Sequence, residues 1–600
     1  MQRTDDRNPN YYHRVVDCQW ACPAHTNVPE YIRLIAQGRY TEAYMVNRES
    51  NVFPGILGRT CDRPCEPACR RTRVDGKPVA ICRLKRVAAD LKDPDIRPLL
   101  PRIPVEKNGK RVALIGAGPA SLTVANDLMP LGYHVTIFER LPRPGGLMRI
   151  NIPAFRLPET ILDEEIAYIV DMGVEMRYDT PVDSLAALLD AKEFDAVFVG
   201  SGAPKGKELK IPGRYDTDQI FIGIEWLESI HFGHVDSIGK RVLIIGVGNT
   251  AMDCCRSSKR LGATDVKVIA RKTRRYFKAS PWELEDAEEE GVEIVENLQP
   301  VRFIIENGTL TGMEFEQFKS IEIDGKLQQE VIGRVILPCD SVVLAIGQDN
   351  AFPWIERNIG LQFDKWDMPV VDKTTFMSTR PGMFVGGDAA FGPANIIWAV
   401  EHGHQAAISM HNYCHGIPIV QRPSQSSTLS STKMGLHEWA YSNDYDPSQR
   451  VKMKHVDMPH RFQALTIEVE KGFTPEQTDI EVQRCLNCDI QTHFTDALCI
   501  ECDACIDICP TDCLTIAPNG EERELEERLT APRITPDQPL FVSGGLKQTG
   551  RVMVKDENVC VHCGLCAERC PTYAWDMRKF VLQIPYAGEA TTSDPVPVGA

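Results

Sequence analysis

Two cysteine runs near the C-terminus have the spacing of iron–sulfur ligands. They read Cys499-x2-Cys502-x2-Cys505-x3-Cys509-Pro510 and Cys560-x2-Cys563-x2-Cys566-x3-Cys570-Pro571. In such a run three thiolates bind one [4Fe–4S] cluster, and the fourth binds a neighbouring cluster. Cysteines also bind zinc or form disulfides, but a four-cysteine run that ends in proline is not the two-pair arrangement of a zinc ribbon. The two runs therefore predict a pair of clusters of the bacterial type and one-electron transfer.

The overall composition restricts the class of protein. The 600 residues carry 67 Lys and Arg against 83 Asp and Glu, a net charge of −16. This charge disfavours nucleic acid and anionic membrane surfaces, because both attract basic faces. No apolar run reaches transmembrane length, and residues 1–10 are polar and charged, so we expect neither a membrane span nor a signal peptide.

The 21 cysteines are distributed unevenly. Six lie between Cys18 and Cys82, eleven lie between Cys485 and Cys570, and four lie in the long middle. Clustering at these short spacings, in a chain without an export signal, indicates metal ligation in a reducing compartment. We therefore expect a cytoplasmic protein.

A first dinucleotide fingerprint begins at residue 111 with the run RVALIGAGPAS. Its turn lets backbone N–H groups and a helix N-terminus approach a pyrophosphate. The next apolar strand, residues 134–138, ends in Glu139, which is placed for a ribose diol. A tight turn that holds no ligand is the alternative. The candidate cofactor residues are Gly116, Gly118, Pro119, Ala120, Glu139 and the following Gly145 and Gly146.

A second fingerprint begins at residue 241 with RVLIIGVGNTA and supplies Gly246, Gly248, Asn249 and Thr250. Its next apolar strand, residues 265–270, is followed by bases and not by an acid. A basic cluster binds a 2′-phosphate that a carboxylate would repel, so the sequence favours NADP(H) over NAD(H). A solvated basic loop is the alternative. The basic residues are Arg271, Lys272, Arg274 and Arg275.

A third segment completes the flavin side. Residues 381–390, PGMFVGGDAA, place Gly387 and Asp388 at the end of an apolar strand. Ala394, Asn395 and Ile396 then open a helix whose N-terminus stabilises negative charge on a reduced flavin ring. Two nested nucleotide sites with this segment predict one site for FAD and one for NAD(P).

The elements that position these motifs predict an α/β multidomain chain. We expect a helical N-terminal domain, two nested Rossmann-like nucleotide-binding domains and a C-terminal ferredoxin-like domain of α+β class. The expected boundaries are 1–108 for the helical domain, 109–225 with 340–415 for the FAD-binding domain, 226–339 for the NAD(P)-binding domain, 416–480 for a linker and helical segment, and 481–600 for the ferredoxin-like domain with an insertion (about 517–550) and an extended tail.

Together these residues resemble the small (beta) subunit of NADPH-dependent glutamate synthase. The relatives of that subunit include the N-terminal part of dihydropyrimidine dehydrogenase and the large subunit of the bifurcating ferredoxin–NADP reductase. The resemblance covers about residues 12–415. It implies FAD in the first site, NAD(P)H in the second and two N-terminal [4Fe–4S] clusters, and it adds Arg140, Leu147 and Arg156 to the cofactor-binding residues. The matching stretches are Cys18-x3-Cys22-Pro23, Gly58–Cys69, Gly116–Ser121, Glu139, Gly145–Leu147, Ile152–Pro158, Gly246–Asp253, Ala345–Gln348 and Val385–Gly403.

The N-terminus departs from the family pattern. The family has a CxxC pair upstream of the positions that match Cys18 and Cys22, and this chain has none. Six N-terminal cysteines are too few for two clusters, which need eight ligands. The run Arg484-Cys485-Leu486-Asn487-Cys488 looks like the missing element. We therefore predict one cluster held by Cys18, Cys69, Cys485 and Cys488, and another held by Cys22, Cys61, Cys65 and Cys82; a separate fifth site or a zinc knuckle at Cys485 and Cys488 is the alternative.

Few other residues are expected to take part in chemistry. Hydride transfer to a flavin needs no protein acid or base at the nicotinamide, so no catalytic residue is certain, although Asp253 and Glu401 are candidates to line that pocket. The cysteines outside the ligand count are expected to pack as small apolar side chains. They are Cys254, Cys255, Cys339, Cys414 and Cys513.

The motifs connect a hydride donor to one-electron acceptors, and a flavin is the group that exchanges electrons with both. We predict an NAD(P)H-dependent FAD and iron–sulfur oxidoreductase with four [4Fe–4S] clusters. It would be a subunit of a hetero-oligomeric complex and exchange electrons with ferredoxin or with a low-potential partner, such as a 2-oxoacid or aldehyde:ferredoxin oxidoreductase. The alternatives are a stand-alone NAD(P)H:ferredoxin reductase, a glutamate synthase small subunit and, from another class, an electron-wiring scaffold with an idle nucleotide site.

Overall fold

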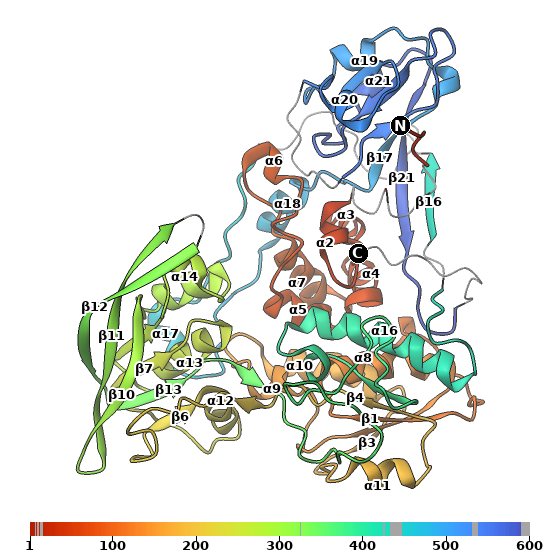
Figure 1. Cartoon of the computed structure of the whole chain (residues 1–600). Helices are drawn as coiled ribbons and strands as arrows, with labels where there is room; N and C mark the ends of the chain where they lie inside the picture. Colours follow the sequence, from red (N-terminus) through yellow and green to blue (C-terminus); the bar gives the residue numbers. More distant parts are fainter. Residues whose placement is uncertain are drawn as a thin grey trace. The chain divides into compact units, whose positions relative to one another are not determined.

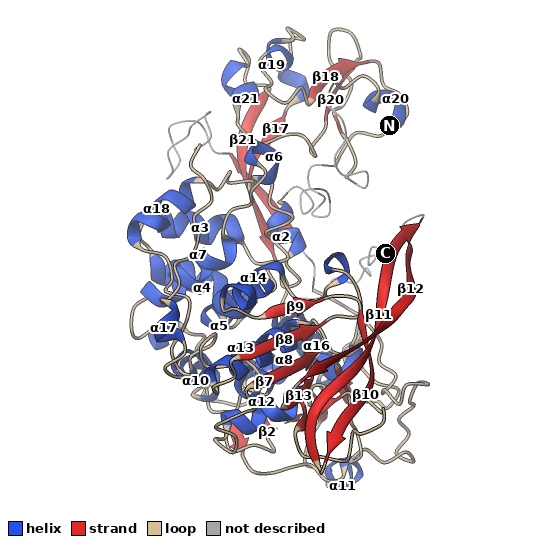
Figure 2. Ribbon diagram, turned by 90° about the vertical axis from the view of Figure 1, so that its left-hand side faces the viewer, coloured by secondary structure: helices blue, strands red, loops and turns tan. Residues whose placement is uncertain are grey.

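The chain forms two compact units. The first comprises Met1–Leu100, Gln421–Met453 and Gly472–Ala600, and the second comprises Pro101–Val420 and Lys454–Lys471. Figure 1 colours these segments along the sequence, and Figure 2 separates helices from strands. The structure is a computed structural model that describes residues 1–5, 8, 11, 16–323, 326–423, 426–431, 447–530 and 538–589.

A five-stranded parallel sheet of order β15-β4-β1-β2-β3 positions the first fingerprint in the second unit. β1 and β4 are buried along almost their whole length, as expected for a parallel sheet covered on both faces. β15 lies far along the chain, yet it pairs with β4 in parallel. The strands are β1 (Arg111–Ile115), β2 (His134–Phe138), β3 (Glu175–Arg177), β4 (Ala196–Val199) and β15 (Met383–Val385).

A second parallel sheet, of order β6-β13-β7-β8-β9, positions the second fingerprint. Here β7 lies between β8 and β13, just as β1 lies between β2 and β4. The segment between the two halves of the first sheet therefore forms a domain of the same type. The strands are β6 (Ile220–Ile222), β7 (Arg241–Ile245), β8 (Asp265–Ile269), β9 (Glu293–Val295) and β13 (Ser341–Leu344).

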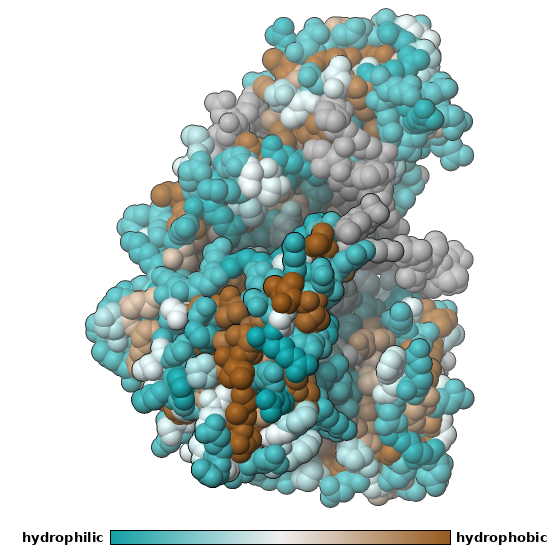
Figure 3. All heavy atoms as spheres, turned by 60° about the vertical axis from the view of Figure 1, so that its left-hand side comes forward, coloured by the Kyte–Doolittle hydropathy of each residue, from teal (hydrophilic) through white to brown (hydrophobic). Residues whose placement is uncertain are grey.

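An antiparallel sheet of β10 (Leu298–Glu306), β11 (Thr309–Ile323) and β12 (Lys326–Pro338) follows β9. Its buried residues, such as Phe303 and Phe315, share an apolar core with the second parallel sheet. Other apolar side chains of the hairpin are exposed, including Val331, Ile332 and Ile336. Figure 3 brings forward the side of the molecule that carries β10, β11 and β12, and it shows apolar atoms on that surface.

Helices and short strands complete the second unit. α16 packs against α8, where a Cβ added to Gly403 would lie 2.7 Å from the carbonyl oxygen of Ala120. The elements are α8 (Pro119–Leu128), η2 (Met129–Leu131), α9 (Leu147–Ile150), α10 (Glu159–Val170), α11 (Leu185–Asp190), β5 (Lys205–Gly206), α12 (Gly223–His231), α13 (Asn249–Arg260), η3 (Arg274–Tyr276), α14 (Pro281–Glu289), β14 (Gln348–Asp349), α15 (Asp388–Phe391), α16 (Ile396–Cys414) and α17 (Met458–Arg461).

The N-terminal part of the first unit is helical. Asn27 caps α3 by accepting a hydrogen bond from the backbone N–H of Glu30, and Pro29 occupies the first turn. The apolar face of α7 packs against α5 and α4, which buries the cysteine-bearing loops between them. The helices are α2 (Asp17–Ala21), α3 (Val28–Ala36), α4 (Tyr40–Asn51), α5 (Pro54–Thr60), α6 (Thr72–Asp75), α7 (Ile81–Leu91) and η1 (Arg97–Leu99).

The C-terminal part of the first unit contains two small antiparallel sheets, β16-β21-β17 and β18-β20-β19. α18 opens it with a capping box between Thr474 and Gln477. The elements are β16 (Ser426–Ser431), α18 (Pro475–Gln483), β17 (Ile490–Phe494), η4 (Asp496–Leu498), α19 (Ala504–Asp507), β18 (Leu514–Ala517), α20 (Glu522–Glu526), β19 (Phe541–Val542), β20 (Val552–Lys555), α21 (Leu565–Arg569) and β21 (Trp575–Gln583).

These elements confirm the predicted fold class and differ from the expected organisation in detail. β6 and β13 pair with one another in the second parallel sheet, although the expected boundaries place both in the FAD-binding domain. Ser426–Ser431, expected to be linker, forms β16 and pairs with β21, because an edge strand needs only backbone hydrogen bonds. Residues 432–446 of the expected linker, 531–537 of the expected insertion and 590–600 of the expected tail lie outside the described residues.

Candidate nucleotide and iron–sulfur sites

The first glycine turn connects β1 to α8. Gly116 has φ +89°, and a Cβ there would lie 2.9 Å from the carbonyl oxygen of Gly200. Pro119 occupies the first turn of α8, and Ala120 is buried behind it. Ser201, next to Gly200, has a buried hydroxyl without a partner among the described residues, which a ligand oxygen would satisfy. The turn therefore brings backbone close to a helix N-terminus and fits a pyrophosphate.

Glu139 follows β2 and folds back over this turn. Its Oε2 accepts a hydrogen bond from the backbone N–H of Ala117 (2.7 Å), and its Oε1 accepts one from Leu141 (2.9 Å). Burial raises the pKa of Glu139, while these two N–H groups oppose that shift. Gly146, at φ +52°, approaches the fingerprint so closely that a Cβ would lie 3.1 Å from the Cα of Gly118. The acid and the glycine pair thus surround one turn, as the sequence predicts.

The third flavin segment converges on the same helix. Gly387 has φ +61°, and a Cβ there would lie 3.2 Å from the Cβ of Ala120 in α8. Asp388 accepts a hydrogen bond from the backbone N–H of Ala394 (3.0 Å), and burial raises its pKa to about 6. Asn395 then caps α16 by accepting from the N–H of Trp398. The first fingerprint, Asp388 and the N-terminus of α16 therefore belong to one site that fits FAD.

The second turn is closed more tightly. Gly246 has φ +118°, and a Cβ would lie 2.2 Å from the carbonyl oxygen of Ala345. Gly248 has open space around its Cβ position, so the entrance to α13 is free for a ligand. Asn249 Oδ1 accepts a hydrogen bond from the backbone N–H of Ser280 (2.9 Å), and Thr250 lies in the first turn. These features fit a second dinucleotide.

The basic loop after β8 divides into two pairs. Arg274 forms an ion pair with Glu288, and Arg275 donates to both oxygens of Glu322 at 2.7 and 2.6 Å. Lys272 lies over the ring of Tyr276. The guanidinium of Arg271, by contrast, has no ion pair within the described part of the chain and is exposed. Arg271 and Lys272 are thus better placed for a 2′-phosphate than the other two predicted residues.

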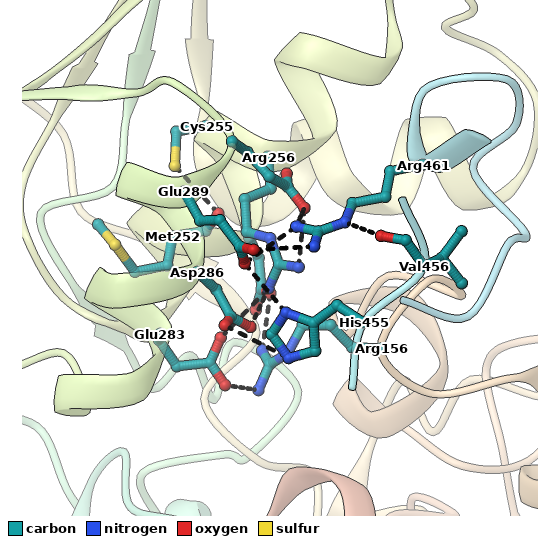
Figure 4. A network of polar contacts seen from close by, with 12 residues as sticks. Arg156, Met252, Cys255, Arg256, Glu283, Asp286, Glu289, His455, Val456 and Arg461 are labelled. Atoms are coloured by element: carbon teal, nitrogen blue, oxygen red, sulfur yellow. Dashed lines mark hydrogen bonds and ion pairs between the residues drawn. The ribbon is translucent and has the colours of Figure 1, made fainter. Parts of the chain in front are cut away.

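Arg156 lies in a network of charges between the loop 152–158 and the helices after the second fingerprint (Figure 4). It donates to Asp253 at 2.7 Å and also forms an ion pair with Glu283. Arg256 and Arg260 stack on Phe155 and bind Glu290.

Arg461, from the returning segment 454–471, reaches Glu289 at 3.1 Å (Figure 4). The network therefore gives Arg156 and Asp253 structural partners, and their predicted roles toward cofactors stay predictions. Glu401 has its electrostatic partners on its own helix α16, in His404 and Gln405, and on α8, in Asp127. Arg140 is paired with Glu228, while Leu147 begins α9.

Four cysteines of the first unit, contributed by its N-terminal part and by the loop after α18, line one hollow. They are Cys18, Cys69, Cys485 and Cys488. The pKa of the Cys18 thiol is raised by burial first and then by the thiols of Cys69, Cys488 and Cys485. This is the grouping expected from the sequence, and its chemistry fits an iron–sulfur cluster.

A second N-terminal group gathers around Lys85 on α7. The charges that raise the pKa of this buried lysine are the thiols of Cys61, Cys82, Cys22 and Cys65, acting against burial. Cys82 Sγ lies 3.3 Å from the carbonyl oxygen of Leu57, so the thiol faces the end of α5. The structure thus brings together the four residues predicted for the other N-terminal cluster.

The two C-terminal runs exchange their fourth cysteines. Cys499, Cys502, Cys505 and Cys570 line one hollow, so the last cysteine of the second run joins the first three of the first. In the other direction, the pKa of Cys563 is raised by burial and then by the thiols of Cys560 and Cys509. Cys566 likewise lies near Cys560 and Cys563. This exchange fits a pair of neighbouring clusters.

The loops that carry these cysteines share one backbone feature, an N–H group that points at the sulfur two residues earlier. The N–H groups of Arg63, Glu501 and His562 each lie 3.4 Å from the sulfur two residues earlier, and all three residues have positive φ. Asn487 has the same relation to Cys485. Such N–H···S bonds stabilise thiolate ligands and set cluster potentials. The repeated feature supports iron–sulfur ligation over plain packing.

The cysteines outside the ligand count are buried, as expected for packing. Cys254 and Cys255 lie in the core around α13, and Cys339 lies in the core of the second sheet. Cys513 differs, because its sulfur lies 3.5 Å from that of Cys509.

Three family models match the chain. Residues 110–403 match the pyridine nucleotide-disulphide oxidoreductases, residues 12–95 match dihydropyrimidine dehydrogenase domain II with its 4Fe-4S cluster, and residues 498–574 match a 4Fe-4S dicluster domain. The small chain of glutamate synthase [NADPH] from Azospirillum brasilense is 32% identical over 420 residues, which are 66% of this chain and 86% of that one. The chain belongs to the glutamate synthase small-chain-like family of FAD/NAD(P) oxidoreductases.

Other members of this family also extend into the C-terminal part. The beta subunit of the NADPH-Fe(3+) oxidoreductase of Geobacter sulfurreducens is 32% identical over 535 residues, covering 81% of this chain and 77% of that one. The beta subunit of the NADP(+)-dependent formate dehydrogenase of Moorella thermoacetica is 34% identical over 509 residues, covering 78% and 70%. Among solved structures, Mycobacterium tuberculosis FprA in complex with NADPH gives a TM-score of 0.44 at 16% identity, over 51% of this chain and 85% of that one.

This family member is therefore a flavin- and iron–sulfur-dependent oxidoreductase with FAD/NAD(P)-binding and 4Fe-4S domains. Within the described residues, no helix is long and apolar enough to cross a membrane.

Sequence reasoning missed the charged residues around the cysteines. Lys85 follows Cys82 by three positions and Arg70 follows Cys69 directly, and both are buried. Basic residues one helical turn from, or adjacent to, a ligand are the signal that could have found them.

Proposed function

We propose that this chain is the NAD(P)H-reactive subunit of a larger redox enzyme, exchanging electrons between NAD(P)H and a partner through FAD and four [4Fe–4S] clusters. The observation that carries the proposal is the gathering of sixteen cysteines into four groups of four. All four groups lie in the first unit. Iron–sulfur clusters accept single electrons and NAD(P)H donates a hydride, so a flavin is needed between them. The second unit has two glycine turns of the kind that bind dinucleotides.

The residues divide into six sites. The first turn, Glu139, Asp388 and Asn395 would hold FAD, which when bound converts hydride transfer into one-electron steps. Gly246, Gly248 and Asn249 would hold the nicotinamide nucleotide. The remaining sites are the four cysteine groups, whose thiolates would hold the clusters and whose N–H···S bonds would tune their potentials.

NADP(H) is the proposed nucleotide. Arg271 and Lys272 are the bases after β8 that are not bound to a carboxylate in the described part of the chain, and both can face a 2′-phosphate. Two relatives named for NADPH or NADP(+) support the same choice.

The proposed partner is a low-potential enzyme subunit in a hetero-oligomeric complex. The relatives named above are beta subunits or small chains, which supports a subunit role. A 2-oxoacid or aldehyde:ferredoxin oxidoreductase and a formate-oxidising subunit are partners of suitable chemistry. None of the 21 cysteines forms a disulfide, which suits the reducing cytoplasm we propose as its location.

Anaerobic titration with NADPH and NADH separately, with iron and FAD counted per chain, tests this function. We expect one FAD and about 16 irons, four for each of four clusters, and flavin bleaching at lower NADPH than NADH. About eight irons would refute the ligand assignment, and a flavin that neither nucleotide bleaches would leave only the wiring scaffold.

A stand-alone NAD(P)H:ferredoxin reductase is the second candidate, because the Cys499 group is exposed at Cys502 and accessible to a diffusing carrier. Purification from the native source separates the two: a stoichiometric partner supports the subunit, and a lone chain that reduces ferredoxin supports the reductase.

A further inference from the structure

Arg70 joins two cysteine groups of the first unit. Its Nη1 donates hydrogen bonds to the carbonyl oxygens of Glu557 and Cys560, each at 2.6 Å. Its Nε donates to Asp17 at 2.8 Å, and only 2% of its side chain is exposed. The arginine follows Cys69 directly, so one residue connects a loop of the N-terminal group to a loop of the second C-terminal run.

The next residue, Arg71, binds a second cysteine-bearing loop. Arg71 Nη1 donates to the carbonyl oxygen of Arg484 (3.1 Å), which precedes Cys485. The two residues after Cys69 thus bind the loops of Cys560 and Cys485 from one backbone segment. Arg71 acts within the Cys18–Cys488 group, whereas Arg70 reaches out of that group to Cys560.

The charge of Arg70 is buried and compensated. Desolvation of a guanidinium costs several kcal/mol unless it is paired, and Asp17 supplies that pairing. Glu557 adds a favourable charge near Arg70, although its carboxylate is held by Lys555 and by His562 at 3.2 Å. Arg70 therefore directs its remaining donors to main-chain carbonyls, which orient the Cys560 loop. The planar fork of arginine suits this better than a lysine does.

The other C-terminal group faces outward. Cys502 is exposed, and so are Ile500 (44%) and Tyr573 (77%) beside Cys499 and Cys570. Cys560, at the Arg70 side, is 8% exposed. The group of Cys560 therefore contacts the N-terminal part through Arg70, and the other group has an exposed ligand, Cys502.

We propose that Arg70 is a positioning residue for electron transfer between the group of Cys69 and the group of Cys560. The C-terminal part of the first unit then exchanges electrons with the N-terminal clusters of the same unit at its second run and with an external one-electron partner at its first. One electron leaves the donor cluster and reduces the acceptor cluster, and no bond forms or breaks. The inference rests on the proposed function, since it assumes clusters at both groups.

Rapid freeze-quench spectroscopy of the whole, cluster-loaded chain tests this role. Arg70→Met removes the donors, Arg70→Lys keeps the charge, and Arg59→Met is the matched control. Arg59 is also buried (4% of its side chain exposed) and also binds a carbonyl and a carboxylate, Gly55 and Asp90, but it does so within the N-terminal helices. NADPH starts the reaction, and the spin-coupled EPR signal of the paired C-terminal clusters is followed in time.

In Arg70→Met we expect this signal to appear about tenfold more slowly, the effect of roughly 1.4 kcal/mol on the barrier. Dithionite should still give the full signal and the full iron content. Arg70→Lys should be intermediate, and Arg59→Met should match the unaltered chain. If the Arg70→Met protein contains less iron, the rate at which the EPR signal appears in Arg70→Lys is compared with that of the unaltered chain instead.

Equal rates in the unaltered chain and the loaded Arg70 variant would overturn the inference. That result differs from failure of the proposed function, in which NADPH would not reduce the clusters of the unaltered chain at all.

Discussion

The two glycine fingerprints of the second unit have similar sequences but different surroundings. β1 and β7 are each the centre of a parallel sheet, and each leads through a positive-φ glycine into a helix. The residues after the next strand differ in charge and in burial. After β2, Glu139 is buried and bound by two backbone N–H groups, whereas after β8 Arg271 is exposed. The duplicated scaffold thus provides the glycine turn twice, and the residue after the next strand differs in charge and burial between the two turns.

The helices after the two turns are also held differently. α8 packs on α16 and adds one buried pair, His404 with Asp127 at 2.6 Å. α13 is held by Arg256 and Arg260, which both bind Glu290 at the C-terminal end of α14. α13 therefore has a network of charged contacts in addition to its apolar core, whereas α8 has the His404–Asp127 pair.

The largest expected effect comes from a methyl group at Gly246. A Cβ there would lie 2.2 Å from a carbonyl oxygen, against 2.9 Å at Gly116, and both glycines have positive φ. We expect Gly246→Ala to lower the free energy of unfolding by about 4 kcal/mol, from overpacking plus backbone strain, and Gly116→Ala by less. Urea unfolding measures both.

Gly248→Ala is the control, because nothing lies within 4 Å of its Cβ position. It should fold normally and weaken only nucleotide binding. A larger loss for Gly116→Ala than for Gly246→Ala would contradict the comparison of the two turns.

Acid should loosen the second fingerprint through Glu290. Burial alone would raise the pKa of this carboxyl, but the hydrogen bond from Arg260 and the charge of Arg256 outweigh it and hold the pKa at about 2. A folded-state pKa below the unfolded value of 4.5 gives stability that is present above pH 4.5 and lost as the pH falls toward 2. This stability is about 3 kcal/mol.

Hydrogen exchange at pH 6 and pH 3.5 tests the expectation. Amides of α13 should lose protection at the lower pH before those of α8. Glu290→Gln should remove most of this pH dependence, and an equal loss in both helices would show that the charge network is not what holds α13.

The sequence predicts much of this comparison and misses the rest for a physical reason. Glycine spacing and the acid or base after each second strand are local signals, so both turns could be predicted. The grouping of Cys485 and Cys488 with Cys18 could also be predicted, because ligand number restricts the choices. The partners of Arg156, Arg274 and Arg275 could not, because ion pairs form between segments whose approach only the fold determines. The strand β16 was missed because Ser426–Ser431 has no apolar alternation, and its pairing depends on β21.

Removing the carboxylate of Glu139 should weaken FAD binding. Both of its oxygens accept backbone N–H bonds, so in Glu139→Gln an amide NH₂ must face one of these donors. Hydrogen bonds to a charged group contribute about 2 kcal/mol, and we expect FAD affinity to fall roughly 30-fold. Fluorescence of released FAD on dilution measures this. NADPH affinity should stay unchanged, and a loss of both would mean that Glu139 supports the whole unit.

The smallest effect separates Arg271 from the other bases. Arg271→Ala should raise the KM for NADPH about tenfold, or roughly 1.4 kcal/mol, and leave the KM for NADH unchanged, because only NADPH carries the 2′-phosphate. Arg275→Ala is the matched control, since Arg275 is already bound to Glu322 at 2.6 Å, and should change either KM by less than about twofold. Steady-state reduction of a viologen dye measures all four constants. If Arg271→Ala raised the KM for NADPH and for NADH equally, the exposed arginine after β8 would not bind the 2′-phosphate. Of the two residues compared, only Glu139 would then contact its cofactor specifically.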